Sequence, residues 1–486
     1  MRRVHHEKPI SLGVFPAVLA FFFAAAVLAP SPLAAAEPGH GIDGASLSLL
    51  WVLPFAGILL SIALLPLLAG AFWHHHYGKV SLLWALAIIA PMLAFAGVSA
   101  TIDQLLHTLL LEYLPFIILI AALFTIAGGI LVRGNLHGSP GVNVSFLGIG
   151  TLLASVVGTT GASMVLIRPL LRANDDRRHS AHTVVFFIFL VSNIGGSLTP
   201  LGDPPLFLGF LKGVDFFWPL TSMFLPMMVA VAVLLVAFFV LDTVIYAKEG
   251  HDRPDPTPDE HPPLGIVGLR NIALLAALIA AVLFSGSVDL GGIAVGSFEV
   301  PLAGLVRDSV LVGLSVLSLM ITPAAIREGN RFSWEPVIEV AKLFGAIFIT
   351  IIPAIAILHS GENGALAPLL RLVTEADGTP NNVMYFWLTG ALSSFLDNAP
   401  TYLIFFNTAG GDPAALQGPL SGTLLAISAG AVFMGANTYI GNAPNFMVKS
   451  IAERHGVAMP SFFGYMGWSA LFLLPTFALI TLVFFT

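Results

Sequence analysis

The residues best suited to chemistry in this sequence are hydroxyl, amide and carboxylate side chains, with accompanying glycines, that interrupt apolar runs at four places. They are Thr159, Thr160, Thr199, Gly202, Asp203, Asp397, Asn398, Thr401, Asn437, Thr438, Gly441 and Asn442. Oxygen ligands of this kind suit small hard cations. A carboxylate within apolar sequence is costly unless it has a partner or a function. The pattern predicts an ion or substrate site, with Na⁺ held at Asp397, Asn398 and Thr401.

The acidic residues have alternative explanations. Asp397 and Asp203 each stand just before a segment that can start a helix, so each is either a cation or proton ligand or an N-terminal cap. Glu112 and Glu339 lie near the ends of predicted spans, where a carboxylate either takes part in proton coupling or lies at the membrane interface. Lys342, three residues after Glu339, can neutralise that second acid on one helix face.

The elements that must position these residues are membrane helices. Charged residues make up 10% of the 486 positions and apolar types 57%, which is too little charge for a soluble surface and predicts a lipid bilayer as the chain's surroundings. A helix needs roughly 20 apolar residues to cross a bilayer. Candidate spans of that length occur at 47–73, 80–100, 105–132, 182–211, 215–246, 267–286, 304–323, 335–360, 419–449 and 461–485.

Two shorter apolar segments, 144–171 and 382–407, contain breaks at Gly158–Gly161 and Asp397–Pro400 and are predicted to be re-entrant hairpins. The side of a membrane protein that is rich in Lys and Arg is the cytoplasmic side. In this sequence most Lys and Arg residues fall on one side only if each hairpin returns to the side from which it started. The first then opens to the cytoplasm and the second outward. Opposite openings predict an inverted topology for the two halves.

An internal repeat supports two halves. Thr199–Phe207 matches Thr438–Phe446, and Thr159–Ser163 matches Asp397–Thr401. We therefore expect an all-α polytopic membrane protein with two inverted-topology repeats, each with a re-entrant hairpin and a broken transmembrane helix. The expected organisation is a signal peptide or first membrane segment at 1–36, a first transmembrane half at 37–246 with its broken helix at 182–211, a cytoplasmic linker at 247–265, and a second half at 266–486 with its broken helix at 419–449.

Other function classes lack support in the sequence. There is no cysteine, no phosphate-binding P-loop and no dinucleotide fingerprint, and no nucleophile and base pair is evident. The adjacent residues His74, His75 and His76 cannot all face one metal ion on a helix. We expect no enzyme activity, no cofactor and no nucleic-acid partner. Helices broken inside the membrane are typical of secondary transporters, so an ion gradient would supply the energy.

Three segments carry a resemblance to a known superfamily: SNIGGSLTPLGDPPLFLG at 192–209, FLDNAPTYLIFFN at 395–407 and GANTYIGNAPNFMVKSIAE at 435–453. With the predicted topology over 47–485, they resemble the ion transporter superfamily. Its members include NhaD-type sodium/proton antiporters, arsenite permeases, and citrate and dicarboxylate carriers. The resemblance implies a scaffold domain, a mobile transport domain carrying both hairpins, a homodimer and elevator-like alternation of access, with a place in the bacterial inner membrane.

The choice of substrate rests on the hairpin tips. Carboxylate carriers of this superfamily typically have Ser-Asn-Thr at both tips, and neither tip reproduces it here. An acid at the second tip, Asp397, would repel a polyanion and favour a cation. The sequence therefore favours Na⁺/H⁺ antiport, with Na⁺ and H⁺ as the transported ions. The alternative is a cation-coupled citrate or other carboxylate carrier in which half-helix dipoles at Gly202 and Gly441 hold carboxylates.

Overall fold

The computed structural model describes residues 42–134, 137–249 and 265–486. The predicted segment 1–36 and nearly all of the predicted linker 247–265 lie outside the described residues. Within them, ten helical stretches are long and apolar enough to span a membrane. Sheet structure in the same residues is limited to two short antiparallel pairs, β1 (Leu131–Arg133) with β2 (Gly265–Val267), and β3 (Gly292–Val295) with β4 (Phe298–Pro301). The expected all-α polytopic membrane fold is confirmed.

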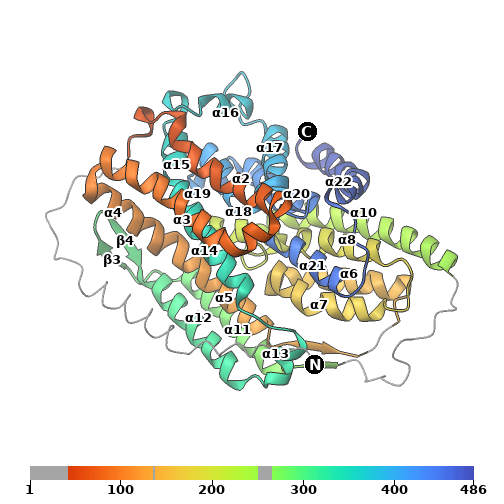
Figure 1. The fold of residues 1–486 in the computed structure, drawn as a ribbon. Coiled ribbons are helices and arrows are strands. Elements are labelled where there is room, and N and C mark those ends of the chain that lie inside the picture. The colour runs from red at the N-terminus through yellow and green to blue at the C-terminus, as the bar shows by residue number, and fades with distance from the viewer. Residues whose placement is uncertain (1–41, 135–136, 250–264) are drawn as a thin grey trace.

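One group of helices, on the left in Figure 1, comes from the start of each half. Helix α3 packs on α2 and α14, and α12 packs on α5 and α11. The members are α2 (Leu53–Leu68), α3 (Gly70–Phe95), α4 (Gly97–Thr108), the π-helical turn η3 (Leu109–Tyr113), α5 (Leu114–Ala127), α11 (Leu269–Ser287), α12 (Leu302–Ile321), α13 (Ala324–Gly329), α14 (Glu335–Thr350) and α15 (Ile352–His359).

A second group contains the interrupted elements. In the first half these are the hairpin α6 (Pro140–Val157) and α7 (Thr159–Ala173), the broken helix α8 (Ala181–Leu190), η4 (Ile194–Leu198) and α9 (Pro204–Leu211), and then α10 (Trp218–Glu249). In the second half they are the hairpin α17 (Asn382–Phe395) and α18 (Asn398–Thr408), the broken helix α20 (Ser421–Met434), η6 (Gly435–Asn437) and α21 (Ala443–Arg454), and then α22 (Phe462–Phe484). The same order of elements recurs, while the inverted orientation of the halves stays a prediction.

Short helices complete the described chain. They are η1 (Gly44–Ser46), η2 (Leu49–Val52), η5 (Gly361–Asn363), α16 (Ala367–Leu372) and α19 (Pro413–Gln417). The core lies around α8, in which every residue from His182 to Leu190 is buried. A helix that is apolar on every side is expected at the centre of a bundle, and this position places the break that follows α8 deep inside the protein.

Both hairpin breaks are shorter than the sequence suggested. In the first, only Gly158 is non-helical, with φ of +80°, a conformation that glycine adopts readily. In the second, Leu396 is extended, Asp397 is non-helical, and helix α18 already begins at Asn398. Pro400 fits inside the first turn of α18 because the N–H groups there have no partner within the helix.

Several spans differ from expectation. Pro140–Val157, predicted as part of a hairpin, is long enough to span a membrane, whereas the predicted span 419–449 contributes the shorter apolar helix Ser421–Asn437. Helix α3 begins at Gly70 rather than near residue 80, so His74, His75 and His76 lie on the helix itself. Polar side chains at a helix end can extend outward, so hydropathy understated its length. Glu112 was expected near a span end but lies at the middle of the helical stretch Gly97–Ala127, in the π-turn η3.

Candidate functional site

The carboxylate of Asp203 lies where both hairpins and both broken helices meet. Its Oδ1 accepts hydrogen bonds from Thr159 Oγ1 at 2.9 Å and from Asn442 Nδ2 at 3.1 Å, and its Oδ2 accepts a short one from Asn398 Nδ2. Asp203 is 1% exposed. We call these four residues the crossing. Each comes from a different element: the start of α7, the start of α9, the start of α18 and the start of α21.

The local sequence explains why the Asp203 side chain is free to reach across. Asp203 is the residue before α9, a position where a carboxylate often accepts from the second or third helical N–H. Prolines occupy the first two helical positions, and no side-chain cap bond forms. Proline has no N–H, and the third N–H, that of Leu206, bonds the backbone oxygen of Asp203. Within the described part of the chain, the carboxylate therefore accepts from Thr159, Asn398 and Asn442 only.

The first hairpin tip contacts the first break directly. The N–H of Thr159 donates to the carbonyl oxygen of Gly202 at 2.8 Å. The first break is also tightly packed on itself, because a Cβ at Gly202 would lie 2.1 Å from the backbone oxygen of Gly196, and a Cβ at Gly196 would lie 2.6 Å from the Thr159 side chain. The tip and the break thus form one hydrogen-bonded unit next to Asp203. Among the described residues, Thr160, the next residue of the tip, makes no side-chain hydrogen bond to the crossing, and its place there stays a prediction.

The threonines of the two breaks have matching structural contacts. Thr199 Oγ1 donates to the backbone oxygen of Ser155, and Thr438 Oγ1 donates to that of Ser394. Each hydroxyl also accepts an N–H two residues later, both at 3.2 Å. The threonines therefore join each broken helix to the first helix of its own hairpin, α6 or α17. The matching contacts give the internal repeat a three-dimensional counterpart.

Asp397 caps helix α18 in this structure. Its Oδ1 accepts from the N–H of Ala399 at 3.2 Å, and the hydroxyl of Thr401 donates to its backbone oxygen at 3.0 Å. Asp397 is close enough for its charge to act on Asp203. Of the two acids that the sequence singled out at the breaks, Asp203 belongs to one interrupted element and contacts the other three, whereas Asp397 contacts its own helix. A cation role for Asp397 stays a prediction.

Several buried acceptors near the crossing have no hydrogen-bond partner. They include the side-chain oxygens of Asn398, Asn193 and Asn437. Asn193, which the sequence analysis did not single out, donates through Nδ2 to Ile188 O at 2.8 Å and Asn445 Oδ1 at 2.7 Å, linking the two broken helices. Its place in SNIGG, just before the first break, was the available signal. An unpaired buried oxygen is costly, and a bound cation would satisfy it.

The two glutamates lie apart from the crossing. Glu112 Oε1 accepts from Lys212 Nζ at 2.6 Å, so the π-turn is ion-paired to the residue just after α9. Lys342 lies 5.2 Å from the centre of the Tyr77 ring, and no ion pair between Lys342 and Glu339 is found. The expected pairing of Glu339 with Lys342 is therefore absent from this arrangement.

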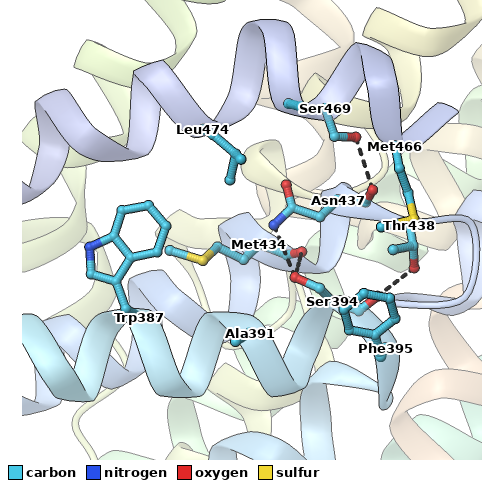
Figure 2. Close-up of a pocket in the computed structure, with 11 residues that line it drawn as sticks. Trp387, Ala391, Ser394, Phe395, Met434, Asn437, Thr438, Met466, Ser469 and Leu474 are labelled. Carbon is cyan, nitrogen blue, oxygen red and sulfur yellow. Dashed lines mark hydrogen bonds between the residues drawn. The ribbon is translucent and has the colours of Figure 1, made fainter. Parts of the chain in front are cut away.

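A cavity of about 250 Å³ lies beside the second break, between α17, η6 and α22. Figure 2 shows the Asn437 side chain donating to the Ser394 hydroxyl at 2.9 Å, and Ser469 donating to the Asn437 backbone oxygen at 2.9 Å. The remaining wall is mainly apolar, including Trp387 and Leu474. The cavity carries no charged side chain.

The donor set of the crossing consists of one carboxylate, one hydroxyl and two amides, which suits a hard cation. Within residues 42–134, 137–249 and 265–486, no three His, Asp or Glu side chains gather as a transition-metal site. This includes the run from His74 to His76. The chemistry available at the crossing is therefore binding and release of a small ion or of a proton at Asp203.

The ten apolar spans of the described residues, and paired interrupted helices that meet at a buried polar cluster, define a multi-pass membrane transport protein. The particular family follows from the sequence as a whole. Residues 44–485 match the family described as "Putative citrate transport", and the chain belongs to it. No curated protein matches the chain.

Proposed function

We propose that this protein is a secondary active transporter that binds Na⁺ and H⁺ in turn at Asp203 and exchanges one for the other across the membrane. The observation that carries the proposal is the buried carboxylate of Asp203, which receives hydrogen bonds from Thr159, Asn398 and Asn442 and, among the described residues, from no positively charged side chain. A buried carboxylate without a cationic partner is strongly disfavoured. Either Na⁺ or a proton would neutralise it.

The surrounding groups support competition between the two ions. The Thr159 hydroxyl and the unpaired Oδ1 of Asn398 supply neutral oxygens close to the Asp203 carboxylate. Na⁺ would use such oxygens as ligands, whereas a proton would need only the carboxylate. One carboxylate cannot hold both ions with full strength, so each would displace the other. This competition is the thermodynamic basis of exchange.

The crossing also gives a route from ion binding to conformational change. Its four residues belong to four elements that lie far apart in the sequence, so the charge state of Asp203 alters hydrogen bonds to both halves at once. A ligand shifts a conformational equilibrium only through different interactions in the two states. Placement in a bacterial inner membrane and assembly as a homodimer are part of the same proposal and follow from the resemblance.

The test is an ion-dependent change in a pH gradient across inverted membrane vesicles. Addition of Na⁺ should dissipate the gradient with the wild-type protein and should have no effect with Asp203→Asn, which keeps the shape and loses the charge. Asp397→Asn is the matched variant. If Asp397→Asn retains exchange and Asp203→Asn loses it, the ion binds at Asp203. If Asp397→Asn loses exchange and Asp203→Asn retains it, the ion binds at Asp397. Exchange that survives both substitutions would contradict the proposal.

A cation-coupled citrate or other carboxylate carrier is the second candidate, and the family match favours it. In that case a cation at Asp203 would offset the repulsion between this acid and a substrate carboxylate. Uptake of labelled citrate, driven by a Na⁺ or proton gradient and lost in Asp203→Asn, would support this function. Na⁺-dependent proton movement without citrate, and no citrate uptake, would support antiport.

A further inference from the structure

An arginine cluster lies between the first hairpin and the turn that follows helix α13. Arg168 and Arg172 are on α7, one turn apart, and Arg331 follows α13. Both Arg172 and Arg331 are close enough for their charges to act unfavourably on Arg168. In the part of the chain that the structure describes, none of the three forms an ion pair.

The backbone holds Arg331 in an unusual conformation. Its φ is +49°, and among the described residues it is the only residue other than glycine with a positive φ. The N–H of Arg331 donates to Glu328 O at 2.9 Å, and that of Phe332 donates to Arg327 O at 2.8 Å. This pattern is a Schellman helix ending, whose left-handed position is usually glycine. A long cationic side chain is therefore present where glycine would be less strained.

The surroundings fix this turn firmly. Asn330 donates to the backbone oxygens of Gly128 at 3.0 Å and Ile130 at 2.6 Å. The Phe332 ring lies 5.3 Å from that of Phe124 on α5, and Phe332 packs on the small cluster that contains Phe124 and Met164 of α7. Met164 is one turn before Arg168. The packing of Phe332 on the cluster that contains Met164 therefore places the turn that carries Arg331 beside the part of α7 that carries Arg168.

The hydrogen bonds of the cluster leave guanidinium donors available. Arg168 has one contact, at 3.5 Å to the backbone oxygen of Met164, and Arg172 has one at 3.3 Å to Val132 O. Arg172 also lies near Asp175, whose charge acts favourably on it. Neither Arg168 nor Arg331 forms an ion pair with a described residue. Arg168 is half-buried and Arg331 is exposed. Like charges in such an arrangement favour a bound anion.

We propose that Arg168 and Arg331, assisted by Arg172, form a binding site for an anion that presents carboxylate or phosphate oxygens. Guanidinium groups match the planar oxygen pairs of both anions. Two sources share this chemistry, a dissolved polycarboxylate such as citrate and the phosphate of an anionic lipid headgroup. The site is separate from the crossing and needs no cation at Asp203. Anion binding at the arginines and ion exchange at Asp203 can therefore be measured independently.

The test uses the full-length protein purified in detergent. Citrate is titrated by calorimetry at constant ionic strength, and native mass spectrometry counts adducts of phosphatidylglycerol against phosphatidylcholine. The variants are Arg331→Gly and Arg168→Gln, with Arg371→Gln as the matched control, since Arg371 is an exposed arginine already paired with Glu362. We expect affinity for the bound anion to fall about ten-fold or more in the first two variants and to be unchanged in the control.

Arg331→Gly separates a binding role from a structural one. Glycine suits a left-handed position, so the melting temperature of this variant should equal or exceed that of wild type while anion binding falls. Loss of citrate binding would identify a dissolved carboxylate as the ligand, and loss of phosphatidylglycerol adducts alone would identify the lipid headgroup. If wild type binds neither anion, or if both variants bind as wild type does, the proposed site does not exist.

Discussion

Asp203 and Asn442 occupy matching positions before α9 and α21, and they differ in one atom that changes the chemistry of the crossing. Asn442 Nδ2 can donate to Asp203 Oδ1, whereas a second carboxylate there would repel the first and a second amide would leave no charge to attract a cation. Asp203 and Asn442 together therefore provide a single negative charge, on Asp203, that accepts a hydrogen bond from the neutral amide of Asn442. A duplicated framework has become chemically asymmetric at its centre.

Thr159 gives a test at this scale that preserves the charge. Thr159→Ala removes the hydroxyl that contacts Asp203 Oδ1 at 2.9 Å. Loss of one hydrogen bond to a buried charged group costs about 1–3 kcal/mol, so the half-saturating Na⁺ concentration for exchange should rise roughly 5-fold to 150-fold. Na⁺ titrations of the pH-gradient signal measure this value.

Two further variants complete the Thr159 test. Thr159→Ser retains the hydroxyl and should remain close to wild type. Thr408→Ala removes a hydroxyl that bonds only the backbone of its own helix, at Ile404, and should have little effect on Na⁺ dependence. An unchanged half-saturating concentration in Thr159→Ala would mean that this hydroxyl does not contribute to ion binding.

At the scale of elements, the first hairpin is fastened at its base by a buried polar network. Asp242 on α10 accepts from Arg177 at 2.7 Å, His182 at 2.8 Å and Asn143 at 2.9 Å. Asn143 on α6 and Asn174 after α7 also exchange hydrogen bonds at 2.9 and 2.8 Å. The network joins both arms of the hairpin and the start of α8 to α10, so these elements should move as one body.

Asp242→Asn should therefore destabilise the whole protein. Removing one charge from a buried ion pair costs about 3–5 kcal/mol, and the ion pair that Arg177 keeps with Glu249 at 2.7 Å places the expected cost at the low end of that range. Thermal unfolding in detergent measures the effect. The control is Glu362→Gln, which breaks the exposed pair with Arg371 and should cost at most about 1 kcal/mol. Equal melting temperatures for the two variants would show that the network does not fasten the hairpin.

The sequence predicted the interrupted elements well because a glycine, an Asp-Asn pair and prolines within apolar runs have direct local effects on a helix. It could not predict which acid reaches the crossing. Asp203 contacts Asn398 and Asn442, which are 195 and 239 residues away, and such pairings depend on how separate helices pack. The π-turn at Glu112 and the strand pairing of β1 with β2 were missed for the same reason. Both arise from tertiary contacts without a distinctive local pattern.

At the scale of the whole molecule, helix α9 links the crossing to the other helix group. Asp203 precedes α9, and Lys212 follows it and pairs with Glu112 in the π-turn between α4 and α5. Arg307 of α12 lies 5.9 Å from the centre of the Phe207 ring on α9. A π-turn inside an α-helix often marks a functional position. If the two groups move against each other during transport, the contact between Lys212 and Glu112 must break and reform.

Locking this contact should stop transport. The chain has no cysteine, so Glu112→Cys with Lys212→Cys introduces the only thiols, and a reducible bifunctional thiol reagent can join them. We expect the joined protein to lose transport and to regain the activity of the unjoined variant when the reagent is reduced. Arg371→Cys with Glu362→Cys is the matched control, because that pair is exposed and only nine residues apart in the chain; joining it should leave transport unchanged. Transport that continues with Glu112→Cys and Lys212→Cys fully joined would show that α9 and the π-turn stay together throughout the cycle, and the moving boundary would then have to lie elsewhere in the molecule.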